Sequence, residues 1–263
     1  MQKKNILNSY KTILGQYCAI SQFVELSKRC FLDEHALEIE KRDSFIELAT
    51  KNKITLTSYD SATMVNAISR SYIVNVNLCF ETFLKDMDAE IKCFGKKAHN
   101  AKDPKESWLE CVVKNVVGKL PKEYQKLYEL CNYYRLVRNT AVHDLCDVRT
   151  HEVEYKKLKK YDFRKESKFS KLIAPNPYDE IIFDDFVMFS RSSVELATFL
   201  FSQIEYDYDK IVLDIPEELK AVWRRYSQSR CENAIYAYIN TIYRADDSLN
   251  KQLPHLCNLV RAR

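Results

Sequence analysis

Glycine is scarce in this chain, and the scarcity limits the folds that are open to it. Only Gly15, Gly95 and Gly118 occur among 263 residues, whereas globular proteins use about 7% glycine. Tight β-hairpins and phosphate-binding loops both depend on glycine, because their backbones turn sharply or approach another group closely. The composition therefore predicts an all-α fold and argues against a Rossmann or P-loop nucleotide site.

Apolar residues recur at spacings of three and four along several stretches, as expected of amphipathic helices. The clearest stretch begins at Ser61 and ends before Gly95, a residue type that often follows a helix C-terminus. Asp103-Pro104 has the pattern of a cap and a first-turn proline. We expect the remaining helices over residues 5–30, 33–52, 103–117, 121–146, 184–206 and 216–244. Residues 149–171 and the last twenty residues show no clear apolar periodicity, so their secondary structure is not predicted. A short strand near residues 210–215 is an open alternative.

The cysteines and the charge set bounds on location and partners. There are nine cysteines, and none forms a Cys-x-x-Cys pair. Several occupy apolar helical positions, where a free thiol packs as a small hydrophobic group. We therefore expect a reduced, cytoplasmic setting and no metal site. The chain has no secretory signal and no apolar run long enough to span a membrane, so no membrane partner is expected. A net charge of +4 permits an anionic partner without requiring one.

The helix expected over residues 121–146 contains Arg-Asn-Thr-Ala-Val-His at positions 138–143. Arg138 supplies a positive charge, Asn139 a hydrogen-bonding amide and His143 a group that titrates near neutral pH, all within about two helical turns. Cleavage of RNA without a metal needs such groups, because a proton must be moved and charge on the phosphate must be stabilised. These three residues are the candidate catalytic groups.

Helix geometry separates the motif from the residues expected to face the core. Asn139 and His143 share a face with Arg135, roughly opposite the apolar stripe. Arg138 lies at the flank, about 140° around the helix from His143. It must either curl toward the imidazole or act at a site completed by a second subunit. The alternative is a surface histidine near a helix C-terminus, where a cation suits the helix dipole. The stripe expected to face the core comprises Leu130, Tyr134, Val137, Ala141 and Leu145.

The motif resembles the Arg-x4–6-His signature of HEPN domains, in which a polar residue, often asparagine, follows the arginine. HEPN domains are helical bundles that carry a Glu-x3-Lys/Arg pair on an earlier core helix, and Glu81 and Lys85 match that pair here. The resemblance covers about residues 60–146 and, less clearly, 184–206. It implies an HEPN-like bundle over 56–206. Helical extensions over 1–55 and 207–263 are expected to pack with it as one globular unit.

The resemblance also implies an activity. HEPN proteins characteristically cleave RNA without metal or cofactor, so the chain is expected to be an endoribonuclease that leaves 2′,3′-cyclic phosphate and 5′-hydroxyl ends. His143 would be the acid/base, Arg138 would stabilise the phosphorane, and Asn139 would hold the phosphate or His143. Glu81 and Lys85 would orient these groups, although an ordinary i,i+4 helix pair is the alternative.

Partners follow from the same resemblance. HEPN protomers usually join their motifs in one groove, which implies a homodimer with a composite active site. Prokaryotic relatives often act as toxins or antiviral effectors in abortive infection, which implies an antitoxin or another regulatory partner. A catalytically inactive helical interaction or scaffold module remains the main alternative. A DNA-binding regulator is less favoured, because no short helix-turn-helix with a basic recognition helix stands out.

The stretch 149–171 holds nine Lys/Arg against four Asp/Glu. Cations interleaved with aromatic rings suit single-stranded RNA, because phosphates attract charge and unstacked bases bind flat faces. A solvated connection between helices is the alternative. The candidate RNA contacts are Lys156, Lys157, Lys159 and Lys160, with Tyr155, Tyr161, Phe163 and Phe169 as the interleaved rings.

Overall fold

The computed structural model describes residues 5–35, 42–55, 61–143, 148–243 and 246–262. Within these ranges the protein is all-α, as the scarcity of glycine predicts, and the one β-type contact is an isolated bridge between Gly95 and Tyr206. None of the described helices combines the length and the apolar character needed to cross a bilayer.

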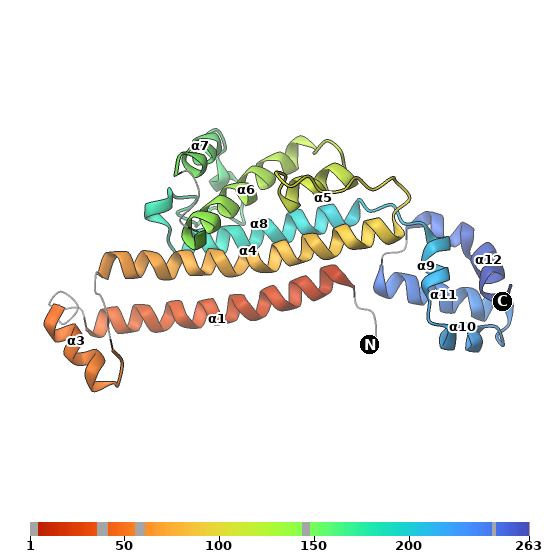
Figure 1. Cartoon of the computed structure of the whole chain (residues 1–263), viewed down its shortest axis with the longest axis horizontal. Helices are drawn as coiled ribbons and strands as arrows, with labels where there is room; N and C mark the ends of the chain where they lie inside the picture. The colour runs from red at the N-terminus through yellow and green to blue at the C-terminus, as the bar shows by residue number, and fades with distance from the viewer. Residues whose placement is uncertain (1–4, 36–41, 56–60, 144–147, 244–245, 263) are drawn as a thin grey trace. The chain divides into compact units, whose positions relative to one another are not determined.

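Four helices are the longest of those described (Figure 1). They are α1 (Ile6–Glu34), α4 (Ser61–Phe94), α6 (Lys122–His143) and α8 (Phe183–Ser202). The helices predicted from residues 5 and 61 are confirmed, and α4 ends directly before Gly95. A second helix starting at Asp33 is wrong, because α1 continues through that residue; α3 (Arg42–Lys51) follows later in the chain.

Capping decides where α5 (Trp108–Val116) begins. The Ser107 hydroxyl accepts from the Glu110 amide at 3.2 Å, and the Ser107 amide donates to the Glu110 carboxylate at 2.7 Å. This reciprocal pair satisfies two amide donors that a helix N-terminus leaves unpaired. The predicted start at Asp103-Pro104 is therefore wrong. Asp103 instead accepts from the Lys105 amide in a turn.

The C-terminal region differs most from the sequence-based expectation. Residues 210–215, left open as a strand, belong mostly to helix α9 (Tyr208–Asp214), which Asp207 caps. The single helix expected from residue 216 is two helices, α10 (Glu217–Trp223) and α11 (Gln228–Ile242), because Ser227 caps a new start. The weakly patterned end is α12 (Asp247–Arg261). The remaining elements are α7 (Val148–Leu158), η1 (Phe163–Lys165) and η2 (Tyr178–Glu180).

The contacts divide the chain into two compact units. We call Met1–Thr12, Phe80–Pro121 and Leu196–Arg263 the C-terminal unit, and Ile13–Cys79 with Lys122–Glu195 the motif unit. Helices α1, α4 and α8 contribute residues to both. The domain boundaries expected near residues 55 and 206 stay a prediction.

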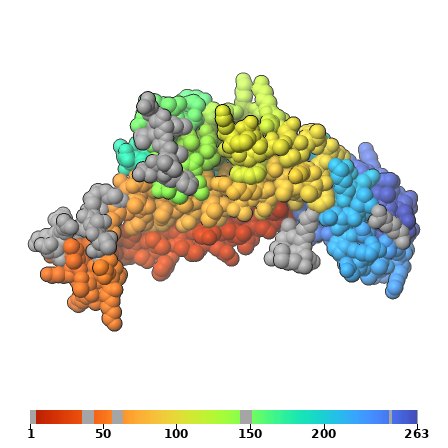
Figure 2. Space-filling view, in the orientation of Figure 1, coloured from red at the N-terminus to blue at the C-terminus, as the bar shows by residue number. Residues whose placement is uncertain are grey.

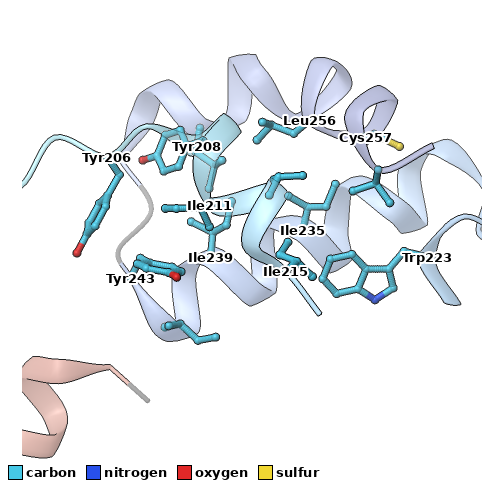
Figure 3. Packing of buried hydrophobic residues seen from close by; sticks show 14 of the residues in the cluster. Tyr206, Tyr208, Ile211, Ile215, Trp223, Ile235, Ile239, Tyr243, Leu256 and Cys257 are labelled. Atoms are coloured by element: carbon cyan, nitrogen blue, oxygen red, sulfur yellow. The ribbon is translucent and has the colours of Figure 1, made fainter. Parts of the chain in front are cut away.

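An apolar cluster forms the core between helices α9 to α12 of the C-terminal unit (Figure 3). Helices α9 and α11 both pack on α12, and Ile211, Ile235 and Ile239 in this cluster have no exposed surface. The ring of Tyr243 packs edge-on against that of Tyr206, with 5.4 Å between centroids. The Tyr206 hydroxyl donates to the buried carboxylate of Glu90, so the polar end of this ring is satisfied inside the core.

Helix α1 keeps several large apolar side chains at the surface, where it is drawn in red in Figure 2. Phe23 is 71% exposed, Leu26 62% and Ile20 57%. On the other side of the helix, Leu14 is buried, so α1 has one apolar side inside and a second one in solvent. Exposed apolar surface of this kind is typical of interaction sites.

Candidate active site

Helix α6 positions the Arg–Asn motif, and its buried side anchors it. Leu130, Tyr134 and Val137 are fully buried, as the predicted stripe requires. The prediction that Ala141 continues the buried stripe is wrong, because Ala141 is exposed, and Leu145 lies outside the described residues. More than the predicted stripe is buried, so a wide face of α6 contacts the core. The additional buried residues are Leu127, Cys131, Tyr133 and Leu136.

Arg138 and Asn139 are half-buried near the C-terminal end of α6. The Arg138 Nη1 atom donates to Asn139 Oδ1 at 3.0 Å, which holds the two side chains together. The amide group of Asn139 is neutral, so this bond orders the guanidinium without itself placing a negative charge beside it. The amide nitrogen of Asn139 also has N–H donors that can bind an anion. His143 is the last residue of α6, and its side chain lies outside the described atoms.

Arg135 lies one turn before Arg138 and was not among the predicted site residues. Its Nε and Nη2 atoms both donate to Asn132 Oδ1, at 3.1 and 2.8 Å. Side chains three residues apart are neighbours on a helix surface, so the two guanidinium groups share one side of α6. The sequence signal that could have found Arg135 is the lack of any acidic residue between Leu130 and His143.

Helix α7 packs on α6 and carries two of the predicted RNA-binding lysines, Lys156 and Lys157, while Lys159 and Lys160 follow its end. The Lys160 ammonium lies 2.9 Å from the Glu129 carboxylate of α6, and Lys157 lies 2.5 Å from Glu154. These two charges are therefore partly offset by carboxylates. Lys159 lies over the ring of Tyr155 at 5.3 Å from its centroid. All four lysines, including Lys156, are exposed.

The aromatic residues of the basic stretch do not all face solvent. Phe163 and Phe169 are buried, with 4% and 0% of their surface exposed, and their rings contact each other edge-on. The expectation that they stack on bases is wrong, because these rings fill the interior of the motif unit. Tyr155 and Tyr161 are half-buried and retain some accessible surface.

Glu81 and Lys85 form an ion pair of 2.7 Å on α4. The Lys85 ammonium also lies 5.8 Å from the centroid of the Trp108 ring. Both residues belong to the C-terminal unit, whereas Arg138 and Asn139 belong to the motif unit. The role of the pair in orienting the motif stays a prediction.

A buried polar network holds α6 to the segment before α8. Asp185 accepts four hydrogen bonds: from the Tyr134 hydroxyl at 2.8 Å, from the Asn176 amide and side chain at 2.8 and 2.9 Å, and from the Ile182 amide at 3.0 Å. The bond from the Ile182 amide satisfies a backbone donor at the N-terminus of α8. Burial raises the pKa of Asp185, although the hydrogen bonds act in the opposite direction. The network fixes α6 through Tyr134, one turn before Arg138.

The structure describes the side chains of two histidines in the motif unit, His35 and His151, and His151 lies on α7. It is 4% exposed, and its ring stacks on Tyr178 at 4.9 Å between centroids. The Arg70 guanidinium lies 4.6 Å from the centroid of the same Tyr178 ring. The Nε2 atom of His151 is enclosed without a hydrogen-bond partner. Burial lowers the pKa of His151, against the opposing influence of Glu152 and Asp179.

The buried thiol of Cys111 suits packing rather than nucleophilic chemistry. Burial, followed by the nearby Asp88 carboxylate, raises the pKa of Cys111 to about 11. In the described ranges, no group of three or more His, Cys, Asp or Glu side chains is arranged to hold a metal ion.

Comparisons of the chain with protein-family models, with curated proteins and with solved structures gave no match. The case for a function therefore rests on the residues and the geometry described above.

Proposed function

We propose that this protein is a metal-independent endoribonuclease of the HEPN type that cleaves single-stranded RNA with the motif on α6. The observation that carries the proposal is the hydrogen-bonded Arg138–Asn139 pair, half-buried on a well-anchored helix beside the basic helix α7. The Arg138 guanidinium supplies a permanent positive charge and N–H donors in a planar fork, and both suit an oxyanion. Action as a toxin or antiviral effector, under the control of a regulatory partner, is part of this proposal.

The reaction is an internal transesterification. The ribose 2′-oxygen forms a bond to phosphorus while its proton passes to His143. The bond from phosphorus to the 5′-oxygen breaks as that oxygen takes a proton from water, and His143 returns its proton to solvent. Arg138 stabilises the negative charge that builds up on the phosphorane oxygens. Asn139 positions the guanidinium through their 3.0 Å bond. The products are a 2′,3′-cyclic phosphate and a 5′-hydroxyl.

The first test is incubation of the purified protein with single-stranded RNA in EDTA. We expect cleavage by the wild type and by His255→Ala, a variant at an exposed histidine of the C-terminal unit. His143→Ala and Arg138→Gln should be inactive. Cyclic-phosphate ends on the products identify the mechanism. Cleavage that persists in His143→Ala contradicts the proposed role of that residue.

A composite active site makes a separate prediction. Light scattering should report a dimer, and mixing His143→Ala with Arg138→Gln protein should restore part of the activity if the two groups act in trans. An active monomer contradicts the composite site but leaves the ribonuclease proposal standing.

The alternative function is an inactive helical interaction module, and the exposed apolar side of α1 favours it. A module of this kind would show no cleavage in EDTA. Its toxicity on overexpression, if any, would be the same with and without His143→Ala.

A further inference from the structure

We propose that Arg135 binds a second phosphate, next to the one that is cleaved, so that efficient substrates carry at least two consecutive phosphodiesters. This inference rests on the proposed ribonuclease function and extends it to the length of RNA that the site recognises. It concerns the side of α6 that carries Arg135, Arg138 and Asn139.

The geometry places two guanidinium groups one turn apart. Residues at i and i+3 have Cβ atoms roughly 5–6 Å apart on a helix surface, a separation that suits neighbouring phosphates of an extended strand. Arg135 is fixed by two bonds to Asn132 Oδ1, at 3.1 and 2.8 Å. Arg138 is fixed by its bond to Asn139 Oδ1 at 3.0 Å. Both side chains are half-buried, so each is ordered yet accessible.

The electrostatics favour an anion at this place. The bonds that order Arg135 come from a neutral amide, which holds the guanidinium without offsetting its charge. The chain from Leu130 to His143 contains no acidic residue. Arg135 therefore offers a positive charge that no carboxylate of its own helix segment offsets, one turn from the residue proposed to bind the scissile phosphate.

Arg135 differs in this respect from two lysines of the basic stretch, one in α7 and one just after it. Lys157 and Lys160 have carboxylates within 2.5 and 2.9 Å, which offset part of their charge. The guanidinium group of Arg135 has N–H donors beyond the two that Asn132 uses, in a planar fork that binds phosphate oxygens in pairs. Arg135 is therefore better suited than these lysines to bind one defined phosphate.

Binding is the first measurement, because it does not require cleavage. The probe is a fluorescent single-stranded oligonucleotide with 2′-O-methyl riboses, in EDTA, over a range of salt concentrations. We expect Arg135→Gln to weaken binding about tenfold and to lower the salt dependence by about one counterion. Arg164→Gln, which removes an exposed charge from η1 of the same unit, is the matched control. Arg135→Lys should fall between wild type and Arg135→Gln, and unchanged circular dichroism excludes misfolding.

Cleavage of short substrates locates the phosphate. A dinucleoside monophosphate has only the scissile phosphate, whereas a trinucleoside diphosphate has one neighbour. Arg135→Gln should raise the KM for the longer substrate about tenfold and leave its kcat and the shorter substrate unchanged. Arg138→Gln should slow both.

The outcomes separate the two proposals. If the wild type cleaves RNA while Arg135→Gln and Arg164→Gln behave alike, the second phosphate site is overturned and the ribonuclease stands. If binding depends on Arg135 but no RNA is cleaved, the phosphate site stands and the proposed activity fails. If the wild type does not bind the oligonucleotide, the inference is overturned as well.

Discussion

The two compact units bury different kinds of side chain. The C-terminal unit closes around aliphatic and aromatic residues, and its buried polar residues in the described ranges are Glu90, Asn115 and Lys220. The motif unit also buries many polar groups: Ser21, Glu25, Ser69, Asn77, His151, Asp185, Ser192 and Ser193. An apolar core gains stability from packing alone. A polar interior adds directional bonds that fix the positions of its helices, and it is costly where a bond is missing. The unit with the polar interior is also the one that carries the candidate site.

The largest effect is expected in the apolar core. Ile239→Ala should lower the free energy of unfolding by about 2–5 kcal/mol, because it removes buried methyl groups and leaves a cavity. Ile239 has no exposed surface, whereas Leu213 of the same unit is 52% exposed. Urea denaturation should therefore show little change for Leu213→Ala. Equal losses in both variants would contradict the packing described for this unit.

A smaller but still clear effect is expected in the polar interior. Asp185→Asn keeps the shape of the side chain but replaces one acceptor oxygen by an NH2 donor. The N–H and O–H groups that donate to that oxygen in the wild type then lose their acceptor. We expect a loss of about 1–3 kcal/mol. Asp184→Asn is the matched control, because Asp184 accepts one exposed bond, from the Ile173 amide at 2.8 Å. An equal loss of unfolding free energy in Asp184→Asn would contradict the stabilising role of the buried network.

The third prediction concerns pH. The folded-state pKa of His151 lies below its ordinary value of 6.5, so the unfolded chain takes up a proton more readily than the folded one. The stability that neutral His151 contributes is present above pH 6.5 and is lost as the pH falls through the folded-state pKa. His151→Phe should make the unfolding free energy less dependent on pH in this acidic range. Substitution of the exposed His255 by alanine is the comparison, and an identical profile for His151→Phe and wild type would contradict the prediction.

The smallest effect is expected on the exposed side of α1. Phe23 is 71% exposed, so Phe23→Ser should change the unfolding free energy by less than about 0.5 kcal/mol. Leu14→Ala, on the buried side of the same helix, should cost several times more. Chemical denaturation of the two variants checks the contrast, and a large loss from Phe23→Ser would show that this side contributes to folding.

Much of the site was accessible from the sequence. Arg138 and Asn139 were identified from their order and spacing, and the burial of Leu130, Tyr134 and Val137 confirms how α6 is oriented. Arg135 was placed on the correct face but not recognised as a candidate, since its bond to Asn132 depends on rotamers that periodicity does not specify. His151 was missed for a similar reason: its stacking partner, Tyr178, is distant in sequence and reaches it only through tertiary packing.

The sequence by itself determined the all-α class and the long helices α1 and α4, because scarce glycine and apolar residues at helical spacing are local properties of the chain. It also placed the Arg–Asn pair near the end of α6. Only the tertiary structure decided that residues 208–214 are helical, that Ser227 starts a new helix and that Phe163 and Phe169 are buried. The reason is physical: a short segment takes the conformation that buries its apolar side against neighbours, and those neighbours come from distant parts of the chain.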